Sequence, residues 1–175
     1  IDNFDDCGFG CSYRNIQTIL SAYSIKHNIN IPTIEELVKY FNPDYKNLYN
    51  KQLWIEPLDI SKYLLDKYNI KCHNLLYVIS DLDANNILKS DINYYIKNNL
   101  IYNNFIELKK LLISYLNTTE LPIVIDDGTY SYCLYKINNN EIILLDPHTT
   151  NSNNVIKTYN ISFLQNKFWM ICIPE

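Results

Sequence analysis

One cysteine that follows a glycine-rich turn is the residue of this chain best suited to covalent chemistry. Cys11 stands behind a Gly-Phe-Gly turn in the segment DDCGFGCSYRNIQTIL, where apolar residues begin to recur with helical spacing. The unpaired N–H groups and the positive dipole end at the start of a helix favour a thiolate, which predicts a lowered pKa for this thiol. We therefore interpret Cys11 as a nucleophile and Cys7 as a bystander. The alternative is that Cys11 only packs beneath the helix.

A thiol nucleophile in acyl transfer needs an imidazole that takes its proton and later protonates the leaving amine. His27 lies about four helical turns beyond the cysteine, and His73 has no acid close by in the sequence. His148 follows Asp146 and Pro147 in EIILLDPHTT, and the proline favours extended chain at the residue before it. Residues i and i+2 of extended chain point the same way, so we expect Asp146 to orient the His148 ring. The alternative is an ordinary Asp-Pro turn.

The residues that must position the cysteine carry mainly helical patterns as far as Pro122. In chain order the sequence predicts a four-turn helix after Cys11, a short helix capped by Thr33 and Glu36, a polar loop over 42–53, a helix starting near Pro57 or Asp59, a strand over 75–80, and two helices between Asp83 and Asn117.

Beyond Pro122 the period changes to that of a sheet. The segments PIVID, YSYCLYKI, EIILLD, VIKTY and FWMICI are separated by turn-rich stretches, which predicts a mostly antiparallel meander over 122–173. Helices first and sheet afterwards indicate an α+β fold. We expect one domain over residues 1–175, since this length supplies a single proper core.

Composition excludes several classes of function. The formal net charge is −4 and the lysines are scattered, so no basic stripe is present for nucleic acid. No apolar run is long enough to span a bilayer, so we expect no direct membrane insertion. The five cysteines lie mostly in apolar segments, which favours reduced thiols and a cytoplasmic protein. The three histidines supply no second pair at zinc-finger spacing, so we predict no metal and no cofactor.

Several motifs, in order along nearly the whole chain, resemble one known family. DDCGFGCSYRNIQTIL resembles the Asp-x-Gly-Trp-Gly-Cys-x-Tyr-Arg-x-x-Gln-Thr signature of the ubiquitin-fold-modifier-specific cysteine proteases, and LLDPHTT resembles their Leu-Asp-Pro-His segment. IPTIEEL, QLWIEPLDIS, LPIVIDDG and FWMICIPE also have counterparts in that order. The resemblance implies a papain-like fold, with the nucleophile at a helix N-terminus in the helical half and Asp-Pro-His on a C-terminal antiparallel sheet.

The same resemblance implies an activity and a set of site residues. It implies hydrolysis after the C-terminal glycine of the ubiquitin-fold modifier, in precursor or conjugates, by the triad Cys11, Asp146 and His148. A narrow groove for the glycine tail is expected, with small residues admitting the backbone and flat aromatics covering it. The substrate-binding candidates are Gly8, Phe9, Gly10, Trp54 and Gly128. For Trp54 the alternative is a core residue.

Three positions depart from the family pattern. Phe9 replaces a tryptophan, Asp126 and Asp127 replace two glycines of a Gly-Gly-Gly turn, and Tyr132 stands where histidine is usual. A tyrosine of that family's oxyanion hole would lie upstream of Ile1, so we expect this chain to be the C-terminal part of a longer protein.

The expected partners are the ubiquitin-fold modifier, its protein conjugates and an adaptor at the endoplasmic reticulum surface. Two other interpretations stay open. The autophagy-related cysteine proteases also combine a Gly-Trp-Gly-Cys helix start with Asp-Pro-His, although the Tyr-Arg-x-x-Gln-Thr continuation and the Trp54 segment favour the ubiquitin-fold-modifier enzymes. The domain could instead be an inactive module that binds the modifier, against which the intact cysteine, aspartate and histidine argue.

Overall fold

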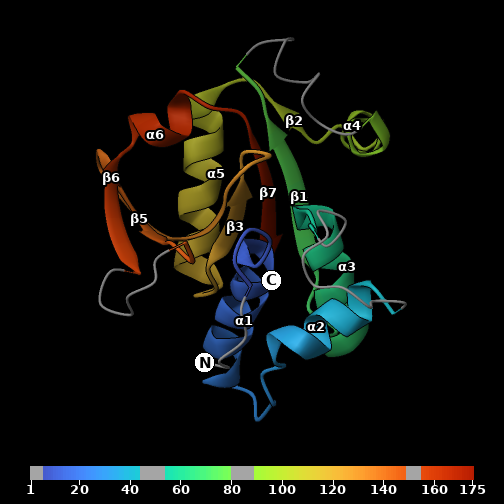
Figure 1. The fold of residues 1–175 in the computed structure, drawn as a ribbon. Helices are drawn as coiled ribbons and strands as arrows, with labels where there is room; N and C mark the ends of the chain where they lie inside the picture. The colour runs from blue at the N-terminus through green and yellow to red at the C-terminus, as the bar shows by residue number, and fades with distance from the viewer. Residues whose placement is uncertain (1–5, 44–53, 80–88, 149–154) are drawn as a thin grey trace.

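The computed structural model describes residues 6–43, 54–79, 89–148 and 155–175 (Figure 1). Its helices are α1 (Cys11–Ser24), α2 (Ile34–Phe41), α3 (Pro57–Tyr68), α4 (Lys89–Lys97), α5 (Phe105–Thr118) and α6 (Ser162–Gln165). Its strands are β1 (Cys72–Tyr77), β2 (Ile101–Tyr102), β3 (Ile123–Asp126), β4 (Ser131–Asn138), β5 (Glu141–Leu145), β6 (Ile156–Asn160) and β7 (Trp169–Pro174). Within the described residues the strands form one seven-stranded sheet in the order β2-β1-β7-β3-β4-β5-β6.

Local capping signals confirm the predicted helix starts. The Thr33 hydroxyl accepts from the Glu36 N–H, and the Glu36 carboxylate accepts from the Thr33 N–H, so α2 begins with a capping box. Pro57 occupies the first turn of α3, as expected for a residue that has no N–H to leave unpaired. The Asn104 side chain caps α5. The residues 44–53 of the predicted loop and residues 83–88 of the predicted helical stretch lie outside the described residues.

The sheet differs from the predicted meander at its last strand. Strands β3 to β6 form the antiparallel meander as expected, but β7 returns to the middle of the sheet, between β3 and β1. Every residue of β7 is buried, which is typical of a strand covered on both faces. The strand predicted over 75–80 is observed at Cys72–Tyr77, because its pairing with β7 begins at Cys72 opposite Pro174. The short parallel strand β2 was not predicted.

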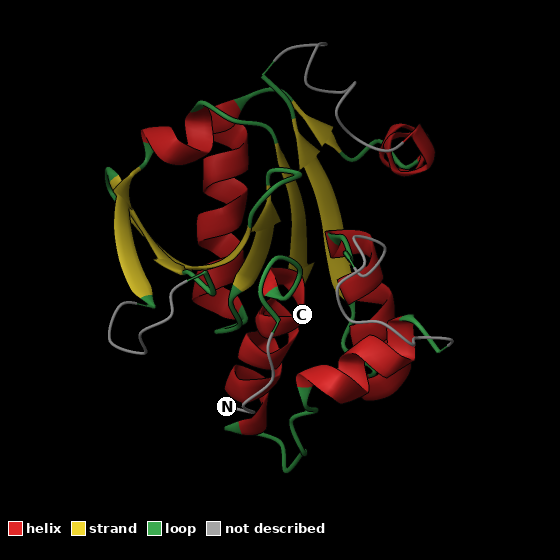
Figure 2. Cartoon of the chain, viewed as in Figure 1, coloured by secondary structure: helices red, strands yellow, loops and turns green. Residues whose placement is uncertain are grey.

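Helices cover both faces of the sheet (Figure 2). On one face α1, α2 and α3 pack around Val124, Cys133 and Cys172, and on the other α5 packs against Ile123, Ile125 and their neighbours. The confirmed helix α1 therefore lies against the central strands, with its first turn near the end of β3. None of the helices in the described segments is long and apolar enough to cross a membrane.

Candidate active site

The turn that precedes α1 is built around two glycines and one aspartate. Gly8 has a φ of 88°, a conformation that favours glycine. A Cβ on Gly10 would lie 2.0 Å from an Asp6 carboxylate oxygen, so this position also requires glycine. The Gly10 N–H donates to the Asp6 carbonyl at 2.9 Å, and Arg14 Nε donates to the Asp6 carboxylate at 2.7 Å. These contacts fix where the helix begins, and hence the position of Cys11.

Cys11 is half-buried, and its pKa is raised rather than lowered. Burial is the largest cause, and the negative charge of Asp126 adds to it, while N–H groups of Ser131 and Ser12 favour the thiolate without outweighing burial. The lowered pKa expected from the helix start is therefore wrong. The helix end does supply donors, but the sulfur has lost much of the water that would stabilise its charge.

Asp146 contacts His148 as predicted, but the backbone between them does not have the predicted extended conformation. The Nδ1 atom of His148 lies 2.7 Å from Oδ1 of Asp146, and the His148 N–H donates to the same oxygen at 3.0 Å. Residues 147 and 148 form a turn, so the expectation of extended chain is wrong, and the alternative of an Asp-Pro turn is what the structure has. The turn orients the imidazole because one carboxylate oxygen accepts from both backbone and ring.

Lys157 of β6 supports the aspartate from the other side. Its Nζ donates to Oδ2 of Asp146 at 2.6 Å. Burial alone would raise the pKa of Asp146, but the hydrogen bonds from Lys157 and His148 outweigh it and hold this pKa below its usual range. Asp146 is therefore an anion at neutral pH although it is only 4% exposed. The sequence analysis missed Lys157, because only the pairing of β5 with β6 places it beside Asp146.

Tyr130, just before β4, and Ser131 and Tyr132, its first two residues, connect Cys11 with His148. The backbone N–H of Ser131 favours the Cys11 thiolate. Tyr130 and Tyr132 lie on either side of Ser131. Their ring centroids are 5.1 Å and 5.3 Å from that of His148, and both contacts are edge-on. The structure thus gathers the cysteine, the histidine and its aspartate around residues 130–132.

The other predicted site residues differ in their surroundings. Trp54 is half exposed, and its Nε1 donates to the Gly8 carbonyl at 2.8 Å, so it covers the turn before Cys11 and is not a core residue. Phe9 is buried edge-on against Tyr13, which makes it a support for the turn rather than an open surface. Gly128, with a φ of 82°, lies in the β3–β4 turn.

A shallow hollow lies beside that turn. It has a volume of about 380 Å³ and is lined by Ile79, Asp127, Thr129, Tyr130, Asn166, Lys167 and Phe168. Tyr130 joins the hollow to the site, because the same ring touches His148. A larger hollow of about 950 Å³ lies at the other end of α1, around Tyr23, His27 and Tyr135, away from the candidate active site.

The remaining histidines and cysteines lie elsewhere. His27 stacks on Tyr23 at the end of α1, and His73 on β1 contacts Glu175 at 2.7 Å. Cys133 and Cys172 are buried in the core. Burial raises the pKa of Cys133, and a hydrogen bond with Cys72, followed by burial, raises the pKa of Cys172. Among the described residues, no group of three or more histidines, cysteines or carboxylates could hold a metal ion.

Comparisons with known proteins agree with this arrangement. The model of peptidase family C78, a family of cysteine peptidases, matches residues 1–167. A probable Ufm1-specific protease from Oryza sativa subsp. japonica is 25% identical over 202 residues, covering 99% of this chain and 28% of its own length. A Ufm1-specific protease from Caenorhabditis briggsae is 22% identical over 165 residues, covering 88% of this chain and 24% of its own length.

A solved structure shares the fold. The crystal structure of UfSP from C. elegans superposes with a TM-score of 0.66 at 19% identity, covering 99% of this chain and 31% of that one. The expected papain-like α+β fold is thereby confirmed. The chain spans only between 24% and 31% of the length of these three proteins.

Proposed function

Because the chain belongs to peptidase family C78, we propose that it is the catalytic domain of a cysteine protease that cleaves after the C-terminal glycine of Ufm1. The bond cleaved joins that glycine to a precursor extension or to a conjugated protein. The hydrogen bond between Asp146 and His148 carries the proposal, because it supplies an oriented base, and residues 130–132 connect that base to Cys11. Two curated relatives are named Ufm1-specific proteases, which supports this substrate.

The proposed reaction assigns one role to each member of the triad. Asp146 accepts the Nδ1 proton of His148, which leaves Nε2 as the base. Nε2 takes the Cys11 proton as the sulfur attacks the glycine carbonyl, and the imidazolium then protonates the leaving amine. Water, deprotonated by the same nitrogen, hydrolyses the thioester and restores the thiol. The anionic Asp146 stabilises the imidazolium in both steps.

The raised pKa of Cys11 bears on how the thiolate forms. A buried thiol without a pre-formed charge reacts slowly with passing electrophiles. Proton transfer to His148 removes this obstacle, because the resulting imidazolium stabilises the thiolate. We therefore propose that the nucleophile is activated by its base and not by the helix end alone.

The proposed route for the modifier tail passes between the turn before α1 and the turn between β3 and β4. Gly8 is exposed and presents no side-chain bulk there, and the half-exposed Trp54 ring covers its carbonyl. Gly10 is buried against Asp6 and shapes the turn from within. Gly128 lies in the second turn. A glycine tail suits such a passage because it needs space only for backbone. A cytoplasmic location and an adaptor at the endoplasmic reticulum surface stay predictions.

The test is a Ufm1 probe that carries a C-terminal electrophile. Incubation with the protein should give a covalent adduct, which Cys11→Ala abolishes and Cys7→Ala largely retains, because only Cys11 begins the helix. The opposite pattern would overturn the assignment of the nucleophile.

A matched probe built on an autophagy modifier serves as the specificity control. Preferential reaction with that probe would favour the autophagy-type interpretation. Tight binding of Ufm1 without any adduct, with the Cys11 thiol intact, would show that the domain is a binding module.

A further inference from the structure

A buried polar chain that the proposed mechanism does not use runs beneath the nucleophile. The Gly128 N–H donates to Oδ1 of Asp126 at 2.7 Å, and the Ser131 hydroxyl also bonds this carboxylate. The Asn15 amide donates to the Ser131 hydroxyl oxygen at 2.9 Å, and the Cys133 thiol donates to the Asn15 amide oxygen at 3.3 Å. Each of these side chains is buried. Together they connect α1, β3 and β4.

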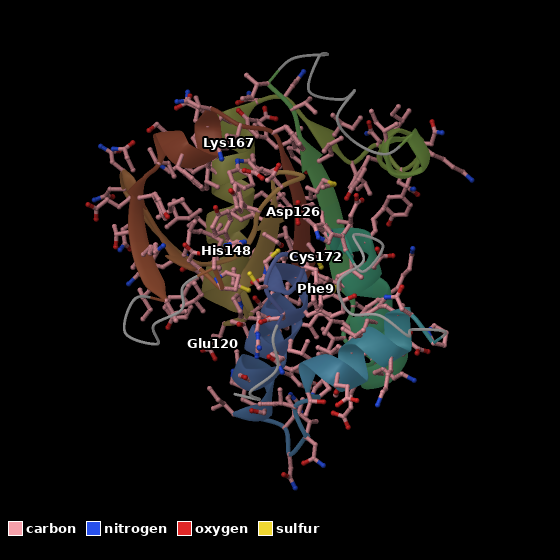
Figure 3. All side chains as sticks on the ribbon, in the orientation of Figure 1. Phe9, Glu120, Asp126, His148, Lys167 and Cys172 are labelled. Atoms are coloured by element: carbon pink, nitrogen blue, oxygen red, sulfur yellow. The ribbon has the colours of Figure 1, made fainter. Side chains whose placement is uncertain are left out.

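The chain meets Cys11 at Ser131. Asp126 and Ser131 stand opposite each other in the register of β3 and β4. Ser131 bonds Asp126 through its hydroxyl and directs its N–H at Cys11, so one residue contacts both groups. Asn15 lies four residues after Cys11, one turn along α1, and ties that turn to β4. Asp126 also lies close to the first turn of α1 in Figure 3.

We propose that Asp126 is a positioning residue that, with Ser131 and Asn15, holds the first turn of α1 in place and whose charge opposes formation of the Cys11 thiolate. Ionised Asp126 stands near the sulfur and makes a second negative charge there unfavourable. The protein thereby keeps its nucleophile as a thiol until His148 accepts the proton. The inference rests on the proposed function only in taking Cys11 as the nucleophile.

Other charged and titratable groups surround this pair. Asp127 in the β3–β4 turn pairs with Lys167 at 2.7 Å, and Asp6 pairs with Arg14. Cys133 on β4 and Cys172 on β7 belong to the core on the Asp126 face of the sheet, whereas Tyr132 belongs to the core on the other face. Tyr130, just before β4, and Tyr132 contact His148, which pairs with Asp146, and Lys157 pairs with that same aspartate. Among these, His148 is the proposed base for Cys11, so its contribution must be removed in a test.

The experiment measures the alkylation rate of Cys11 by iodoacetamide from pH 5 to 9, with no modifier present. A Cys7→Ala, His148→Ala background of the full-length protein is used, and the Cys11 peptide is quantified by mass spectrometry. Asp126→Asn keeps an oxygen for the Gly128 N–H but carries no charge. It should raise the rate at pH 7 by roughly threefold to tenfold, the range expected on removing a nearby like charge, and move the profile to lower pH.

Two further variants decide between an electrostatic and a merely structural role. Ser131→Ala removes a hydroxyl that stabilises the Asp126 charge, so it should raise the rate in the same direction by less. Asp66→Asn is the matched control, because that carboxylate is exposed on α3 beside Lys67, and it should leave the profile in place.

An unchanged or slower rate in Asp126→Asn would overturn the proposal, since a structural role alone loosens the helix start and gains no reactivity. If Asp126→Asn does not fold, an unchanged or slower rate in Ser131→Ala overturns it. Failure of the Ufm1 probe would sink the proposed function and leave this result standing, because iodoacetamide reports on the thiol alone.

Discussion

Two buried aspartates stand on either side of the candidate active site, and they differ in their partners. Asp146 is 4% exposed and Asp126 is 7% exposed, so water is nearly excluded from both. Asp146 contacts the Lys157 ammonium and the His148 ring, and its pKa is lowered. Asp126 contacts a backbone N–H and a hydroxyl, and burial raises its pKa to about 6. The two shifts are opposite because Lys157 and His148 stabilise the charge of Asp146, whereas Asp126 lies deeper, has only neutral hydrogen-bond donors beside it, and is penalised mainly by burial.

The comparison also separates two roles in the site. The stabilised anion at Asp146 favours the imidazolium that forms during the proposed reaction, whereas the anion at Asp126 works against the thiolate. Removing the negative charge of Asp146 should therefore slow the proposed reaction, whereas removing that of Asp126 should ease formation of the Cys11 thiolate.

The largest expected effect is on turnover by Asp146→Asn. Loss of the anion that orients and stabilises His148 should lower kcat/KM for Ufm1 cleavage by about 10³ to 10⁴. Steady-state kinetics measure this loss, and circular dichroism should show an unchanged fold. Asp66→Asn, an exposed carboxylate on α3 that pairs with Lys67, is the control with near-normal rates. Near-normal rates in Asp146→Asn would demote the Asp-Pro-His segment to a structural turn.

Asp126→Asn should raise the free energy of unfolding at neutral pH. The folded protein holds a proton on Asp126 up to about pH 6, whereas the unfolded chain releases it near the ordinary value. Stability therefore falls as pH rises through this window, by on the order of 2 kcal/mol. Asparagine cannot ionise, so the variant should be more stable than the wild type at pH 7 and close to it at pH 4.5.

Urea denaturation at the two pH values checks this difference. A stability difference that is the same at pH 4.5 and pH 7 would show that the charge of Asp126 is not the cause.

Lys157→Met should remove the cation that sets Asp146 apart. At pH 7 the buried carboxylate would lose a hydrogen-bonded partner, so the free energy of unfolding should fall. Because the pKa of Asp146 is lowered, its contribution is present above the ordinary pKa and is lost as pH falls through the folded value. Chemical denaturation should therefore show the effect at pH 7 and little of it in strong acid.

Lys26→Met is the matched control for that substitution. The Lys26–Glu120 ion pair is exposed on both sides, so its loss should leave the free energy of unfolding almost unchanged. If both lysine variants lose the same stability, the Lys157 contact with Asp146 is no stronger than a surface pair.

Trp54→Ala should give the smallest effect and leave the charges of Asp126 and Asp146 unchanged. An exposed aromatic contact with the modifier tail is worth about 1 kcal/mol, so KM should rise about fivefold. The melting temperature should hardly move, since the ring is 51% exposed. A large fall in melting temperature with unchanged KM would show that Trp54 serves only the fold.

The helical half shows how far local patterns reach. The start of α1 at Cys11, the capping box at Thr33 and the start of α3 at Pro57 were all predictable, because each depends on residues within one turn. The place of β7 was not predictable, because a strand that follows β6 in the chain pairs with β3 and β1 in the sheet. β7 lies where helices cover both faces of the sheet, and those helices come from parts of the chain far apart in sequence.

In the candidate site, the sequence by itself determined the residue types that can react: a cysteine at a helix start and a histidine two residues after an aspartate. Only the tertiary structure decided their ionisation. The thiol pKa is raised where the helix start predicted the reverse, because burial and Asp126 outweigh the N–H donors. The two aspartates differ because the pairing of β5 with β6 brings Lys157 to Asp146, whereas Asp126 meets Ser131 and Gly128. Charge depends on distance and on access to water, and both are fixed only when the strands are assembled.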